Sequence, residues 1–120
     1  MPKFASNDVL DGSLMIASGA TRLVAVNEQP ASFAAASAGK LAEATLTGGD
    51  FAFAAGDISG RKVTVAAKSG LAVIAAGTAD HVALLDATRL LYVTTCPAQA
   101  LVLGGTVSIA SWAIEVGAPA

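Results

Sequence analysis

The stretch 90–114, LLYVTTCPAQALVLGGTVSIASWAI, contains no charged residue and decides the fold. An uninterrupted apolar run of about 20 residues would be long enough for a membrane-spanning helix. Polar and turn-forming residues divide this one: Thr94, Thr95, Pro97, Gln99, Gly104, Gly105, Thr106, Ser108 and Ser111. The pieces between them are too short to span a membrane as one helix, so we interpret the stretch as consecutive β-strands.

The same pattern of turn signals extends upstream of residue 90. It begins at Gly48 and includes Gly48-Gly49-Asp50, Gly56-Asp57, Ser59-Gly60, Ser69-Gly70, Gly77 and Asp86. Turns about every 8–12 residues are typical of an antiparallel β-sandwich or barrel, so we expect a mainly β fold. The segments between the turns predict six strands, at 61–67, 71–75, 80–85, 90–95, 100–103 and 106–116.

Short connections predict how these strands pair. Hairpin turns are expected at Lys68-Ser69-Gly70, at Asp86 to Arg89 and at Gly104-Gly105. Because a short connection joins antiparallel neighbours, the six strands should form a meander. Along 106–116 the apolar residues change phase near Ala110, which predicts a β-bulge or a strand buried on both faces.

The N-terminal part of the chain predicts one helix and one strand. Ser6 or Asn7 can cap a short helix that ends near Gly19. The β-branched segment 21–26, TRLVAV, predicts the first strand, and the alanine-rich segment 31–44 predicts a loop with one or two helical turns. We expect a single domain over 1–120, with an N-terminal arm and short helix at 1–20 and a β domain at 21–116.

Composition narrows the class of protein. Charged residues make up 13% of the 120 residues, about half the usual share, and the hydrophobic fraction is 54%. So few charges cannot cover the whole surface, which favours self-association or a partner that covers part of it. A net charge of −2 argues against a nucleic-acid-binding protein.

The N-terminus and the cysteine content indicate the compartment in which the chain folds. Asp8 and Asp11 precede the first apolar run, so a secretory signal is not expected. The single Cys96 has no partner for an internal disulfide, which fits folding in a reducing cytoplasm.

His81 is the only histidine and Cys96 the only cysteine, and they are the first candidates for catalytic or metal-binding residues. A hairpin closed by Asp86 to Arg89 would pair His81 with a residue in 92–95 and place Cys96 near it. The favoured interpretations are a hydrogen-bonded strand histidine and a buried thiol, because no orienting group or second metal ligand accompanies them.

The remaining polar and aromatic candidates have structural interpretations. Asp50, Asp57, Asp80 and Asp86 lie at expected turns or strand ends, where carboxylates bond to turn backbone. The small basic patch of Arg61, Lys62 and Lys68 is interpreted as a solvated hairpin rim. The two large aromatic residues of the β region, Tyr92 and Trp112, are interpreted as core or interface anchors. We therefore assign no catalytic, cofactor-binding or metal-binding residue and expect no enzyme activity and no cofactor.

Several segments resemble a family of small virion proteins of tailed double-stranded DNA bacteriophages and prophages. They are DVLD at 8–11, TRLV at 21–24, SGRKVTVAA at 59–67, GTADHVALLD at 77–86 and LLYVTTCPAQALVLGGTVSIASWAIEV at 90–116. The sequence departs from the family pattern at Gly117-Ala118-Pro119, which lacks an acidic residue before the proline, and in the alanine-rich segment 31–44.

The resemblance implies a structural protein of the virion. Its size fits a head decoration, or cement, protein that binds the outer capsid surface and stabilises the shell. The implied partners are the major capsid protein and further copies of this chain, commonly as a trimer, with no nucleic acid and no membrane. The implied location is the capsid surface after folding in the host cytoplasm. Residues 1–6, with Phe4 as an apolar anchor, are expected to form an arm that orders on binding.

Two other functions stay open at this point. A tail or head–tail junction protein would assemble as a ring. A carbohydrate-binding or host-receptor-binding β domain is a different class, and the low aromatic content, 5%, argues against it.

Overall fold

The computed structural model describes residues 6–117 and shows a mainly β protein with an N-terminal helix, as predicted. All strand pairs are antiparallel. The helices are α1 (Asn7–Ala17) and α2 (Phe33–Gly39), with a 3-10 turn, η1 (Gly48–Asp50). The strands are β1 (Arg22–Val26), β2 (Lys40–Thr45), β3 (Phe51–Ala55), β4 (Arg61–Val65), β5 (Lys68–Ala72), β6 (Gly77–Leu85), β7 (Leu90–Leu101), β8 (Thr106–Ile109) and β9 (Trp112–Val116).

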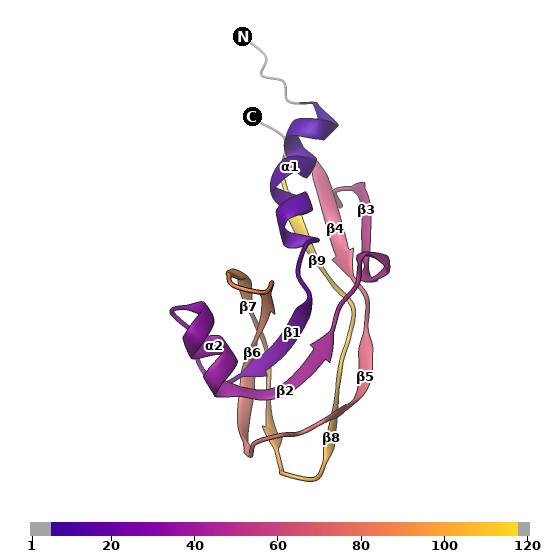
Figure 1. Ribbon diagram of the computed structural model, residues 1–120. Coiled ribbons are helices and arrows are strands. Elements are labelled where there is room, and N and C mark those ends of the chain that lie inside the picture. Colours follow the sequence, from indigo (N-terminus) through magenta and orange to yellow (C-terminus); the bar gives the residue numbers. More distant parts are fainter. Residues whose placement is uncertain (1–5, 118–120) are drawn as a thin grey trace.

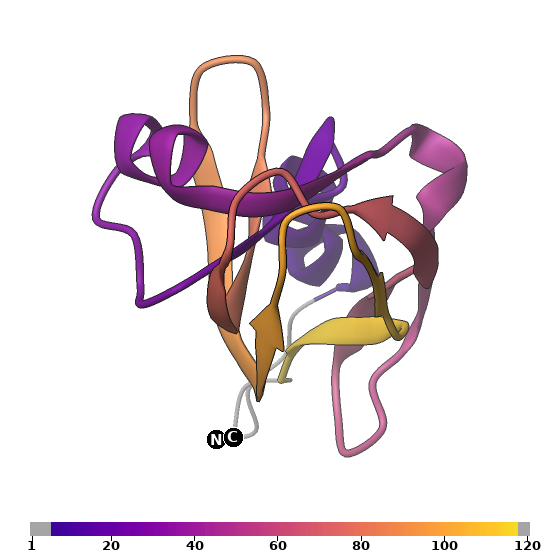
Figure 2. The same cartoon turned by 90° about the horizontal axis from the view of Figure 1, so that it is seen from below.

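The strands form three small sheets in a sandwich-like arrangement. Their strand orders are β2-β1-β6-β7, β3-β4-β9 and β5-β8. The molecule is elongated, 55 × 24 × 24 Å, with α1 at one end and the β7–β8 connection at the other (Figure 1). Seen along the long axis, α2 and the β6–β7 hairpin lie on one side and the β3–β4 hairpin on the other (Figure 2). The sheets do not close into a barrel within residues 6–117.

The core lies on both faces of β1. Leu23 points into a cluster with Leu14 of α1, Val63 of β4 and Leu84 of β6, all fully buried or nearly so. Val24, on the opposite face, belongs to a second cluster that α2 covers. Burying a leucine or valine side chain contributes about 1.5–3 kcal/mol, so the packing on β1 holds the sheets and both helices together.

The first helix forms where the sequence predicts it. The Ser6 side chain accepts a hydrogen bond from the Val9 amide at 3.3 Å, and the Ser18 amide closes the last turn on Leu14. The buried face consists of Leu10, Leu14 and Ala17. This spacing places three apolar residues on one side of the helix, which packs on β4 and β9.

The predicted meander is wrong. β4 pairs with β3 and β9, and β5 pairs with β8, so the segments 61–67 and 71–75 are not neighbours. Lys68-Ser69-Gly70 lies inside β5, where Gly70 adopts φ +67° at a register shift, and does not close a hairpin. The reason is that β3 and β9 occupy both edges of β4, and β3, with alanine at three of its five positions, was not predicted as a strand.

Two of the expected turns have different outcomes. Asp86 to Arg89 closes the β6–β7 hairpin as predicted, with the Asp86 amide bonded to the Arg89 carbonyl at 3.0 Å. Gly104-Gly105 does form a turn, because the Gly105 amide bonds to Val102 at 3.0 Å. The strands on either side of it, β7 and β8, belong to different sheets, so the predicted hairpin there is wrong.

The remaining strand boundaries also shift. The helical turns expected in 31–44 are α2, but the rest of that segment is β2, an unpredicted strand. The predicted strands 90–95 and 100–103 merge into β7, in which Pro97 lies at the register shift opposite Asp80 and has no ladder partner. The phase change near Ala110 is a break between β8 and β9, which pair with different strands.

Candidate functional site: an apolar groove between β7 and β8–β9

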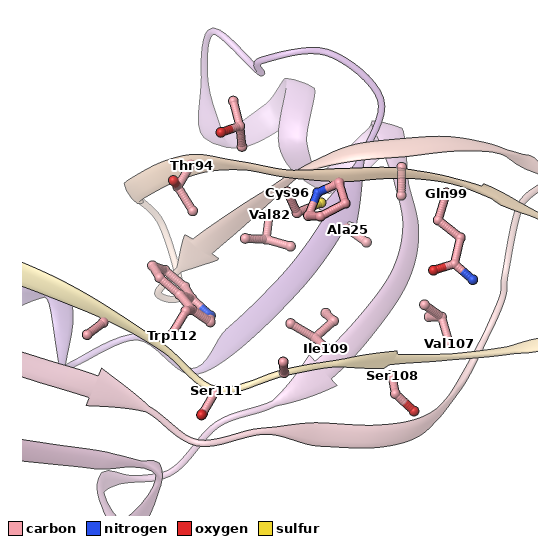
Figure 3. Close-up of a pocket in the computed structure, with 15 residues that line it drawn as sticks. Ala25, Val82, Thr94, Cys96, Gln99, Val107, Ser108, Ile109, Ser111 and Trp112 are labelled. Carbon is pink, nitrogen blue, oxygen red and sulfur yellow. The ribbon is translucent and has the colours of Figure 1, made fainter.

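A cavity of about 460 Å³ lies between β7 and the β8–β9 segment (Figure 3). This volume lies in the range of ligand pockets, about 300–1,000 Å³. None of its lining residues is charged; they are Ala25, Ala79, Val82, Thr94, Thr95, Cys96, Pro97, Gln99, Val107, Ser108, Ile109, Ala110, Ser111, Trp112 and Ala113. We call this cavity the β7–β9 groove.

The groove lies over one face of the four-stranded sheet, where Ala25, Val82 and Thr94 are paired neighbours on β1, β6 and β7, and it is bordered by strands at the ends of their sheets. β7 is the last strand of its sheet, and β8 and β9 are the outer strands of theirs. The edge of β7 and the edges of β8 and β9 therefore lie on opposite sides of the groove (Figure 3). Strand edges carry backbone amides and carbonyls that can bond to another extended chain.

Trp112 is the most informative residue of the groove. Its ring stacks on Tyr92 with centroids 5.9 Å apart and 23° between the planes. Its indole nitrogen Nε1 is buried, yet it has no hydrogen-bond partner within the described part of the chain. Burying a hydrogen-bond donor without an acceptor costs about 1–3 kcal/mol of folding free energy, so this indole N–H lowers the stability of the isolated chain.

His81 makes contacts that the sequence did not predict. Its Nδ1 lies 2.7 Å from Oδ1 of Asp80, although neighbouring side chains in a regular strand point to opposite faces. The β6–β7 register shifts between Ala79 and His81, so the contact lies at an irregularity of the sheet. The expected pairing with 92–95 is confirmed, because His81 lies opposite Thr95.

Asp80 links strand β6 to the segment that follows β1. Its Oδ1 also accepts the amide of Glu28 at 2.8 Å, and Glu28 adopts φ +64°, unusual for a residue other than glycine. The hydrogen bond from His81 and that from the Glu28 amide hold the pKa of Asp80 below its usual range. Asp80 is thus a structural carboxylate that fixes the end of β1 against β6.

Cys96 lines the groove as a protonated thiol. Burial, with a smaller contribution from the negative charge of Asp80, raises the pKa of Cys96. A raised pKa makes a thiol a poor nucleophile and metal ligand at neutral pH. Residues 6–117 contain no group of three or more histidine, cysteine or acidic side chains arranged to hold a metal ion.

The other carboxylates hold turns together. Asp50 accepts hydrogen bonds from Lys68 at 2.9 Å and the Thr47 amide at 2.8 Å, and these lower its pKa. Asp86 accepts the amides of Thr88 and Arg89, and the Thr88 bond is the main cause of its lowered pKa. These two residues have the turn-stabilising role predicted for them.

The predicted basic patch is neutralised by acidic partners. Arg61 pairs with Asp11, Lys62 with Asp57 and Lys68 with Asp50. In residues 6–117 every other lysine and arginine also lies in an ion pair: Arg22 and Lys40 with Glu43, and Arg89 with Asp86. Phosphate binding needs clustered unpaired cations, so this part of the surface is poorly suited to it.

Large apolar side chains lie exposed outside the groove. They gather on the outer face of α1, on the β3–β4 hairpin and at the far end of the molecule: Val9, Met15, Ile16, Phe53, Ile58, Ile74, Val102 and Leu103. Within the described segment no helix is both long enough and apolar enough to cross a membrane. The stretch 90–114 consists of strands, as predicted.

Comparison with known proteins found no matching family model, no matching curated protein and no matching solved structure.

Proposed function

We propose that this protein is a structural component of a tailed-phage virion, a head decoration protein that binds the outer surface of the capsid shell. The observation that carries the proposal is the group of exposed apolar residues Ile74, Val102 and Leu103, which lie in segments without charged residues. Monomeric proteins rarely leave such surface in water, and it is typical of sites that another protein covers.

The surface best suited to the shell is the end of the molecule formed by the β5–β6 and β7–β8 connections. Ile74, Val102 and Leu103 are 49%, 68% and 71% exposed there, and we call them the apolar tip. No charged residue occurs in 69–79 or in 90–114, the two segments that form this end.

Backbone contacts brace the apolar tip. The Val73 amide bonds to the Gly105 carbonyl at 3.0 Å, and Gly77 pairs with Leu101. Both connections are therefore held close to the strands from which they extend. A braced surface loses less conformational entropy on binding than a loose loop, which favours docking on a rigid lattice.

Two further features support a binding role over catalysis. His81 is hydrogen-bonded to Asp80. Burial raises the pKa of the Cys96 thiol, which makes it a weak nucleophile at neutral pH. The resemblance of the sequence to phage virion proteins supplies the virion context. The expected arm with Phe4 lies outside the described residues.

Decoration stabilises a shell by mass action. A protein that binds only the assembled lattice adds its binding free energy to that lattice and to no other state. Many copies together would oppose the internal pressure of packaged DNA.

The direct test is co-sedimentation of the purified protein with capsids that lack it. We expect wild-type protein to sediment with the shells and Leu103→Lys to bind at least about tenfold more weakly, since a buried lysine without a partner costs more than about 1.4 kcal/mol. Thr88→Lys, on the exposed β6–β7 turn, is the matched control and should bind normally. Wild-type protein that stays in the supernatant at all concentrations would overturn the proposal.

A further inference from the structure

We propose that the β7–β9 groove receives strand β3 of a second copy of this chain, so that copies associate head to tail. This inference goes beyond the proposed function, because it concerns contact between copies and requires no capsid. It rests on two features of one chain that complete each other, an open groove and an exposed apolar strand.

The groove has the properties of an acceptor for an extended chain. The edge of β7 borders it on one side and those of β8 and β9 on the other, and its lining carries no charge. Adding a strand to an exposed edge supplies backbone hydrogen bonds, and the side-chain pocket selects the sequence.

Strand β3 has the properties of the donor. Its sequence is FAFAA, and every residue after Phe51 is exposed, including Phe53 at 37%. β3 pairs with β4 on one side only and is the outer strand of its sheet. An apolar edge strand exposed on both faces is unfavourable in an isolated subunit, because it invites pairing with another chain.

The two features lie on different sides of the molecule. β3 projects on the side away from the β6–β7 hairpin (Figure 2), and the groove lies between β7 and β9. A copy therefore cannot fill its own groove. Placed beside β9 of the next copy, β3 would continue the β3-β4-β9 order from one subunit into the other.

Pro97 restricts where pairing on the β7 side can occur. It lines the groove and offers no backbone N–H, so the edge of β7 around residue 97 cannot donate to an inserted strand. Pairing therefore falls on β9 and on the part of β7 that precedes Pro97. Since donor and acceptor surfaces differ, the contact is heterologous and forms a ring if its rotation closes, or a filament if it does not.

Disulfide trapping tests the contact directly, because the native Cys96 already lies in the groove. Ala54→Cys and Ala55→Cys place a second thiol on opposite faces of the exposed strand. On oxidation at mildly alkaline pH, at least one variant should form covalent multimers, detected by non-reducing electrophoresis. The same variants carrying Cys96→Ser should lose these multimers, and Thr88→Cys should form none that depend on Cys96.

Self-association gives a second readout without cysteine chemistry. Light scattering over a concentration series should show oligomers for wild-type protein and at least about a tenfold higher concentration requirement for Ala54→Lys, with Thr88→Lys unchanged. Trp112 is the only tryptophan, so its emission should shift to the blue as copies associate. Circular dichroism checks that each variant is folded.

Two outcomes would overturn the inference. One is wild-type protein that stays monomeric at every concentration. The other is oligomers that persist unchanged in Ala54→Lys while neither cysteine variant cross-links through Cys96. Both are distinct from failure to bind capsids, which would overturn only the proposed function.

Discussion

Arg61 of β4 donates from Nε to Oδ1 of Asp11 in α1 at 3.0 Å, and both side chains are about four-fifths buried. This ion pair is the polar link between the N-terminal helix and the β3-β4-β9 sheet, fifty positions apart in sequence. The apolar face of α1 supplies the rest of that attachment.

Replacing Asp11 by asparagine should therefore destabilise the protein. We expect a loss of about 1 kcal/mol in the free energy of unfolding, because a partly buried cation loses its charged acceptor. Urea denaturation measures the change. Asp8→Asn, on the exposed side of the same helix, is the control and should cost no more than about 0.5 kcal/mol. Equal losses in the two variants would show that the Arg61 contact contributes nothing of its own.

Leu84 should be among the most sensitive core positions. Its side chain is fully buried in the main cluster beside Leu23 and Val63. Leu84→Ala should lower the free energy of unfolding by about 2–5 kcal/mol, the range for cavity-forming substitutions. Leu103→Ala, at the apolar tip, removes the same atoms from an exposed site and should change stability by less than about 0.5 kcal/mol. Thermal unfolding of both variants compares them directly.

Gly56 should not tolerate a side chain. A Cβ built there would collide with the Ser59 carbonyl and lie 2.9 Å from the Glu115 carboxyl carbon. Gly56→Ala should therefore distort the β3–β4 hairpin and cost about 1–3 kcal/mol, measured by urea denaturation. Gly12→Ala meets nothing within 4 Å on α1 and should be neutral or stabilising. A Gly56 variant as stable as wild type would mean that this hairpin can relax freely.

Acid should destabilise the fold through its turn carboxylates. The pKa values of Asp50, Asp80 and Asp86 are lowered from a usual value near 3.8. A lowered folded-state pKa means that the contribution is complete above the unfolded pKa and is lost as pH falls through the folded one. The free energy of unfolding should therefore drop below about pH 4. Urea denaturation between pH 6 and pH 2.5 tests this, and Asp86→Asn should flatten the decline.

Cys96 should react slowly with thiol reagents. Burial and Asp80 raise its pKa, so less thiolate is present at neutral pH than for an exposed cysteine. The rate of modification should rise with pH and should be faster in Asp80→Asn, which removes the nearby negative charge. Asp57→Asn is the control for a carboxylate elsewhere on the surface. A rate at pH 7 equal to that of a free cysteine would contradict the protonated state.

The sequence was sufficient for the elements that carry strong local signals. Ser6 as an N-cap residue predicted α1, and Asp86 predicted the β6–β7 turn that the structure contains. Both depend on interactions between residues a few positions apart. Such interactions can be recognised without knowledge of the rest of the fold.

The sheet topology and the groove could not be predicted in this way. β3 has alanine at three of five positions, so its pairing with β4 depends on the sheet and not on strand propensity. The β7–β9 groove depends on which edges remain unpaired, a property of three sheets together. The contact between His81 and Asp80 lies at a register shift between β6 and β7 that the sequence pattern did not predict.

The position of β9 in the sheet has a consequence for biosynthesis. β4 pairs with β9 through Val65 and Trp112, and β1 pairs with β6 through Arg22 and Leu85. These central strands are therefore synthesised well before the strands with which they pair. A fold dominated by distant pairings closes large loops before it gains stability and folds in milliseconds to seconds. The β4 edge stays open until residues 112–116 have left the ribosome, and during synthesis the nascent chain exposes that edge to other chains.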